Sequence, residues 1–111
     1  MKCLELELHE YICDYCISKG ISLELRWRCF GDLSGFYINN EMFAIACCEY
    51  YASDVEDIKY LMTSYIDAIW EDEETWENIS RSNYRIVIYV ADIVDMDGWY
   101  KVVIGGAISD V

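Results

Sequence analysis

The chain has 111 residues, of which 55% are hydrophobic and 15% aromatic, and its formal net charge is −13. This length suits one folded domain, so we expect residues 1–111 to form a single domain. The aromatic content argues against a disordered chain. The negative charge argues against direct binding to nucleic acid or to an anionic membrane, and it favours a basic protein partner.

The first predicted element is a helix over residues 4–19. Lys19-Gly20 is a typical helix C-terminus. Because the first leucines also alternate as in a short strand, the residue at which the helix begins stays open. The apolar side chains that recur at helical spacing are Leu4, Leu8, Tyr11, Ile12, Tyr15 and Cys16.

Strands are predicted next. Residues 21–29 alternate between apolar and polar side chains, as in a half-buried strand. Residues 36–48 are predicted to form a hairpin, because Asn39-Asn40 accepts the positive φ values that a tight turn needs.

A long helix is predicted to begin at Asp54. Ser53 and Glu56 have the spacing of a capping box. The helix either continues to about Ile79 or bends near Glu71. Its apolar face is predicted to hold Val55, Ile58, Met62, Tyr65, Ile69 and Trp76.

Two further strands are predicted over residues 84–94 and 99–105, joined by a turn at residues 95–98. Gly105-Gly106 is interpreted as a loop or tail. The order helix, three strands, helix, two strands (α-β-β-β-α-β-β) predicts an α+β domain. In it, an antiparallel sheet of about five strands is covered by two helices.

The cysteines are expected to be reduced and to act as small hydrophobic residues. The Cys13-x-x-Cys16 pair lies late in a predicted helix, where the helix dipole disfavours a thiolate. A structural zinc site would need two more ligands at a workable spacing. We therefore expect no metal site, although a metal or redox protein remains a third hypothesis. The six residues are Cys3, Cys13, Cys16, Cys29, Cys47 and Cys48.

Catalytic motifs are missing from the sequence. His9 is the single histidine, and no nucleophile motif or phosphate-binding glycine loop is present. We expect no enzyme, no catalytic residues and no cofactor. No secretory leader and no membrane span are apparent, so a cytoplasmic location in a bacterial host cell is expected.

The sequence EDEETWEN, residues 71–78, carries five acids and no base. On a continuous helix, Asp67, Glu71 and Glu74 share one stripe, with neighbours about 5–6 Å apart. Such a row resembles the phosphates of a DNA strand, and the nearby tryptophans are candidate anchors for a partner. The alternative is a solvated face that only keeps the protein soluble. The candidate partner-binding residues are Asp67, Trp70, Glu71, Asp72, Glu73, Glu74, Trp76 and Glu77.

Residues 35–80 resemble a known family in their order and charge. The hairpin GFYINNEMFAIA, the capped helix SDVEDIKYLMTSYIDAIW and the run EDEETWENIS resemble the layout of small phage anti-CRISPR proteins that inhibit Cas9. The resemblance implies an acidic surface that occupies the site where the effector reads the short motif on target DNA. The two C-terminal strands and the six cysteines depart from that pattern. The matching acids are Glu71, Asp72, Glu73, Glu74 and Glu77.

The leading hypothesis is therefore a phage-type inhibitor that mimics DNA and blocks a nucleic-acid-binding defence protein, such as a CRISPR effector. The alternative is an immunity protein or antitoxin that covers the basic active site of a nuclease toxin. Both hypotheses predict a protein–protein interaction with a basic partner, and the sequence leaves the identity of that partner open.

Overall fold

A computed structural model describes residues 3–27, 37–38, 41–42, 45–77 and 79–110 of the chain. The predicted α+β class and the two main helices are confirmed. The elements follow one another as α1 (Leu4–Lys19), β1 (Leu23–Trp27), β2 (Tyr37–Ile38), β3 (Glu41–Met42), β4 (Ile45–Ala52), α2 (Val55–Trp70), α3 (Glu73–Trp76), the 3-10 helix η1 (Arg81–Asn83), β5 (Tyr84–Asp95) and β6 (Tyr100–Asp110).

Four strands form the main sheet in the order β1-β5-β6-β4. β5 and β6 make a long antiparallel hairpin, and β4 pairs antiparallel with β6. β1 lies parallel to β5, with Leu23 opposite Ile86. The prediction of an antiparallel sheet is therefore wrong for β1, and the sheet is mixed. Apolar and polar residues alternate in the same way in parallel and antiparallel strands, so this pattern does not predict the strand direction. The long segment between β1 and β5 supplies the crossover connection that a parallel pair requires.

The strands β2 and β3 form a separate two-stranded sheet. Tyr37 lies opposite Met42, and Ile38 lies opposite Glu41 in an antiparallel pair. This pairing confirms the predicted hairpin for these four residues, whereas residues 45–48, predicted to belong to it, lie in β4 and pair with β6. Asn39-Asn40, on which the turn prediction rests, lies outside the described residues.

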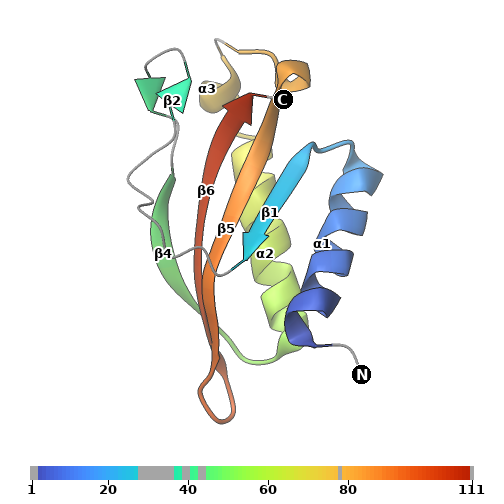
Figure 1. Cartoon of the computed structure of the whole chain (residues 1–111), viewed down its shortest axis with the longest axis vertical. Coiled ribbons are helices and arrows are strands. Elements are labelled where there is room, and N and C mark those ends of the chain that lie inside the picture. Colours follow the sequence, from blue (N-terminus) through green and yellow to red (C-terminus); the bar gives the residue numbers. More distant parts are fainter. Residues whose placement is uncertain (1–2, 28–36, 39–40, 43–44, 78, 111) are drawn as a thin grey trace.

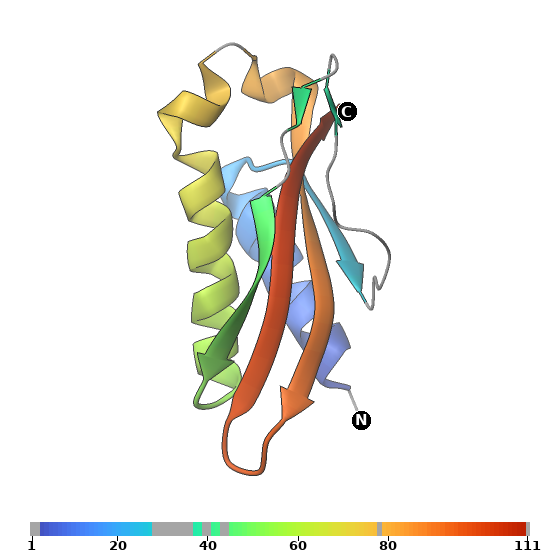
Figure 2. The same cartoon turned by 90° about the vertical axis from the view of Figure 1, so that its left-hand side faces the viewer.

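The helices α1 and α2 lie side by side and cover one face of the sheet (Figures 1 and 2). α1 begins and ends where the sequence predicts. Gly20 takes a φ of 72°, and its N–H donates to the carbonyls of Cys16 and Ile17. Tyr11, one of the side chains at helical spacing, is exposed, and its ring centroid lies 4.9 Å from the Lys59 ammonium. Within the described ranges, no helix is long and apolar enough to span a bilayer.

The main core lies between the two helices and the sheet. Burying each of its large aliphatic side chains contributes about 1.5–3 kcal/mol. A second buried cluster, Val87, Tyr89 and Ala107, forms apart from it. The fully buried large side chains of the main core are Leu8, Ile12, Ile58, Met62, Ile66, Ile86, Ile88, Val90, Val102, Ile104 and Ile108.

The start of α2 differs from the prediction by one residue. Asp54 is the N-cap, and its carboxylate accepts a hydrogen bond of 2.8 Å from the Asp57 N–H. The Asp57 carboxylate in turn accepts from the Ser53 N–H at 2.9 Å. The sequence holds two overlapping cap signals, and the pair of aspartates takes the place predicted for Ser53 and Glu56.

Gly105-Gly106 lies inside β6 and is buried, so the predicted loop or tail is wrong. Gly106 pairs with Ile88 on one side and with Ile45 on the other. A Cβ at Gly106 would lie 3.0 Å from Ile69 and 3.1 Å from Tyr65. The missing side chain therefore allows α2 to approach the sheet closely.

Candidate functional site

The acidic run does not continue α2. The helix ends at Trp70, where the Glu71 N–H donates to the Asp67 carbonyl at 2.9 Å, and the short helix α3 follows. Of the two alternatives drawn from the sequence, the bend near Glu71 is correct. Asp72 explains it, because its carboxylate caps α3 by accepting from the Glu74 N–H at 3.2 Å and from the Thr75 hydroxyl at 2.7 Å.

The bend changes how the acids are presented. Asp67 belongs to α2 and Glu74 to α3, so the predicted stripe through Glu71 is not a row on one helix. Residues 71–77, here called the acidic segment, instead form a turn and a single helical turn. Its carboxylates are all exposed, and they belong to Glu71, Asp72, Glu73, Glu74 and Glu77.

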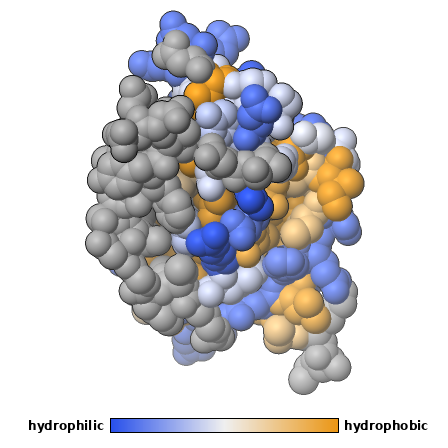
Figure 3. Space-filling model, turned by 45° about the horizontal axis from the view of Figure 1, so that its top comes forward, coloured by the Kyte–Doolittle hydropathy of each residue, from blue (hydrophilic) through white to orange (hydrophobic). Residues whose placement is uncertain are grey.

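The acidic segment lies at the end of the molecule opposite the β5–β6 turn (Figure 1). Figure 3, in which this end is turned toward the viewer, shows hydrophilic residues gathered at the upper margin of the molecule. Two cations of the described residues lie beside this segment: the Lys19 ammonium is 3.8 Å from the Glu71 carboxylate, and the Arg81 guanidinium lies 5.2 Å from the centroid of the Trp76 ring. The carboxylates outnumber these cations, so the local field is negative.

The two tryptophans hold the acidic segment to the body of the protein. Trp76 is only 5% exposed, and its indole N–H donates to the Ile69 carbonyl at 3.0 Å. The half-buried Trp70 meets it edge to face, with ring centroids 5.4 Å apart. Trp76 thus packs in the core, and its side chain is buried in the free protein.

Arg81 supports the same region and is not among the residues predicted from the sequence. Its guanidinium donates to the Trp70 carbonyl at 3.1 and 2.9 Å, at the C-terminus of α2. It also lies 5.5 Å and 5.2 Å from the ring centroids of Trp70 and Trp76. A cation here satisfies the end of the helix and its dipole. Its signal in the sequence is an arginine four residues after Glu77, the last acid of the run.

Asp67 has a structural partner on the other long helix. Its carboxylate accepts from the Tyr15 hydroxyl at 2.5 Å and from the Lys19 ammonium at 2.8 Å. These contacts raise the pKa of both the Tyr15 phenol and the Lys19 ammonium. Tyr15, Lys19 and Asp67, here called the helix junction, join the ends of α1 and α2. Asp67 therefore differs from the other predicted contact acids.

Of the cysteines that the structure describes, Cys16 is buried and suits a packing role, Cys13 is half-buried, and Cys3 is exposed. Cys3, Cys13 and Cys16 are free thiols. Burial raises the pKa of the Cys16 thiol to about 11 and also raises that of Cys13, which disfavours the reactive thiolate. The side chains of Cys29, Cys47 and Cys48 lie outside the described part. The described residues bring together no group of three or more metal-ligating side chains.

His9 also has a packing contact. Its Nδ1 accepts a hydrogen bond of 3.0 Å from the indole N–H of Trp27 on β1. The contact ties the first half of α1 to the edge strand of the sheet.

Comparisons with protein-family models, with curated proteins and with solved structures gave no match.

Proposed function

We propose that the protein is an inhibitory binding protein that presents its acidic segment to the basic nucleic-acid groove of a bacterial defence protein, with a CRISPR effector such as Cas9 as the partner. One observation carries the proposal. Five exposed carboxylates lie within the seven residues 71–77, whereas two described cations lie beside them: Lys19 contacts Glu71, and Arg81 donates to the Trp70 carbonyl. A face that only confers solubility usually interleaves both signs of charge.

The support beneath these carboxylates favours binding. Trp76 is buried, and Arg81 is bonded to the end of α2, so the acidic segment starts from a defined position. A surface that is ordered before association loses less conformational entropy on binding. Arginine and lysine side chains in a nucleic-acid groove would form charge-assisted hydrogen bonds with the carboxylates. The negative field would also accelerate encounter with a basic partner.

The proposal is tested by competition with DNA. Guide-loaded Cas9 is mixed with labelled target DNA and increasing amounts of the protein, and the bound DNA is measured by fluorescence anisotropy. We expect the protein to displace the DNA and to prevent cleavage. DNA binding that is unchanged at every protein concentration would contradict Cas9 as the partner. Protection against a nuclease toxin under the same conditions would favour an immunity protein.

A further inference from the structure

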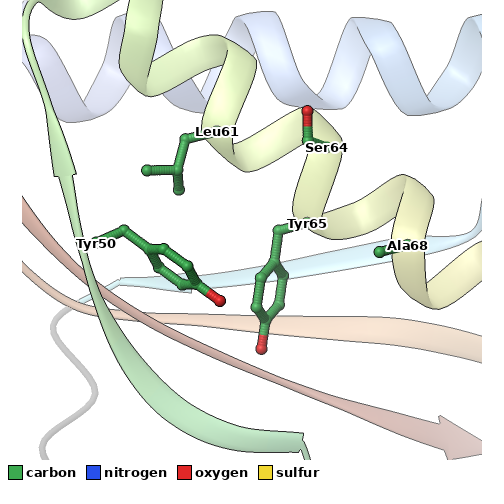
Figure 4. A pocket seen from close by; sticks show the side chains of 5 residues that line it. All are labelled: Tyr50, Leu61, Ser64, Tyr65 and Ala68. Carbon is green, nitrogen blue, oxygen red and sulfur yellow. The ribbon is translucent and has the colours of Figure 1, made fainter.

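An apolar groove lies between α2 and β4, beside the acidic segment. Its wider part has a volume of about 310 Å³, and the adjoining part has a volume of about 210 Å³. Tyr50, Tyr65 and Ala68 line both parts, so the two are continuous and are here called the tyrosine groove. Figure 4 shows the two tyrosine rings between the helix and the strand, with the small side chains Ser64 and Ala68 along the helix.

Small residues create this groove. Ser64 and Ala68 stand one helical turn apart and are exposed, so the helix has little bulk along this edge. Gly106 allows the Tyr65 ring to approach the sheet. Tyr50 then packs edge to face against Tyr65, with ring centroids 6.2 Å apart. The walls are therefore aromatic and are already ordered.

The volume restricts what the groove accepts. Small-molecule pockets usually span about 300–1,000 Å³ and bury most of their ligand. The wider part, at about 310 Å³, is at the lower limit of this range, which suits one large side chain better than a cofactor. Aromatic walls favour an aromatic guest, because edge-to-face pairs contribute beyond simple burial.

The charge at one end specifies the partner further. Asp72 lines the narrower part of the groove and also belongs to the acidic segment. An apolar side chain in the groove would therefore be followed directly by a strongly negative surface. The complementary chain is a basic segment in which an aromatic residue lies beside lysine or arginine.

We infer that the tyrosine groove binds an aromatic side chain from a basic segment of the protein partner, while the acidic segment binds the flanking lysines or arginines. This inference rests on the proposed function and specifies how the partner is recognised. The groove supplies apolar selectivity, which the carboxylates alone do not provide.

The test uses two synthetic peptides, Lys-Arg-Phe-Lys-Arg and Lys-Arg-Ser-Lys-Arg, with capped ends. Each is titrated into the ¹⁵N-labelled protein, and backbone amide shifts are followed by NMR. We expect the Phe peptide to shift the amides of Tyr50, Tyr65 and Ala68 as well as those of the acidic segment. The Ser peptide should shift the acidic segment alone.

A filled groove provides the matched variant. Ala68→Leu places a larger side chain at an exposed helical position without entering the core. We expect it to weaken binding of the Phe peptide by about 10-fold or more, since the aromatic ring loses its site. The control is Ser18→Leu, an exposed position on α1. It should change the affinity by less than about twofold.

The outcomes separate this inference from the proposed function. If both peptides shift only the acidic segment, the groove assignment is wrong while the acidic interface survives. If neither peptide shifts any amide, this inference fails, while the DNA competition with Cas9 still decides the proposed function. If the protein forms a dimer in sedimentation experiments and Ala68→Leu abolishes it, the groove binds a second copy and not a basic partner.

Discussion

Two acidic regions lie close together in this protein and behave differently. At the helix junction, the Asp67 carboxylate meets a hydroxyl and an ammonium at 2.5 and 2.8 Å and joins two helices. In the acidic segment a few residues later, the carboxylates of Glu73, Glu74 and Glu77 are exposed to solvent. Negative charge thus contacts a neighbouring helix in one region and is presented to solvent in the other.

The difference shows that composition alone does not identify a binding surface. An acid contributes to the fold where its partner comes from another element, as Lys19 does for Asp67. An acid is available to an outside partner where other residues make the contacts that hold its segment in place. In the acidic segment those contacts belong to Trp76 and Arg81.

The largest effect on stability is expected from the support of the acidic segment. Trp76→Ala removes a buried ring and its hydrogen bond, and it should lower the free energy of unfolding by about 3–5 kcal/mol. Trp99 is 39% exposed near the β5–β6 turn and serves as the control. Trp99→Ala should cost less than about 1.5 kcal/mol. Urea unfolding measures both, and equal losses would remove the distinction between core and surface tryptophans.

Salt should affect partner binding and folding stability differently. If the acidic segment steers association, the association rate constant with the partner should fall by about 10-fold or more between about 50 and 500 mM salt, because the Debye length shrinks in that range. The melting temperature of the free protein should not fall, since screening also relieves repulsion within the acidic segment. Stopped-flow kinetics and calorimetry provide the two readings. A rate constant that stays flat across this range would indicate a mainly hydrophobic docking surface.

The smallest effect concerns the helix junction. Asp67 is the main cause of the raised pKa values of Tyr15 and Lys19, whose ordinary values are 10.0 and 10.5. A group whose pKa is raised by folding stabilises the folded state at pH values below its ordinary pKa. This stabilisation is lost as the pH rises through the pKa that the group has in the folded protein. Asp67→Asn should therefore lower stability slightly and evenly from about pH 7 to 9.

Above about pH 10 the difference in stability between wild type and Asp67→Asn should shrink, because the Tyr15 phenol and the Lys19 ammonium lose their protons. Glu71→Gln is the control, since Glu71 lies 3.8 Å from Lys19 and has weaker contact with it. Urea midpoints across this pH range provide the measurement. A difference that grows with rising pH would contradict the junction assignment.

Local signals predicted many of the elements. The helix of residues 4–19 was predicted at its observed bounds, because its apolar period and Gly20 agree. The turn predicted at residues 95–98 is confirmed by positive φ values of 62° at Asp97 and 117° at Gly98, with the Met96 N–H donating to the Trp99 carbonyl. These features depend on neighbouring residues alone.

Features that depend on contacts between distant residues were not predictable in the same way. The parallel pairing of β1 depends on which distant strand it joins, and its alternating pattern is the same in both directions. Gly106 resembles a loop signal, yet it lies in a strand because α2 packs against it. α2 ends at Trp70 because the Asp72 carboxylate accepts a hydrogen bond from the Glu74 N–H and so caps α3 in place of a continued helix. The burial of Trp76 follows from that bend.

The central claim is that the position of the carboxylates in the acidic segment, and not the total charge, determines binding. The test variant is Glu71→Gln, Asp72→Asn, Glu73→Gln, Glu74→Gln, in which asparagine still serves as the cap of α3. The control variant also removes four exposed charges, from two other regions. It is Glu10→Gln, Asp14→Asn, Asp92→Asn, Asp97→Asn. Both proteins carry the same net charge and should melt close to wild type.

The decisive measurement is the dissociation constant of each variant for guide-loaded Cas9 at one fixed salt concentration. Four lost charge-assisted contacts should weaken the test variant by about 100-fold or more. The control variant should stay within about threefold of wild type, because only the long-range field changes. Equal weakening of both variants, or unchanged binding by a test variant that melts like wild type, would contradict the account.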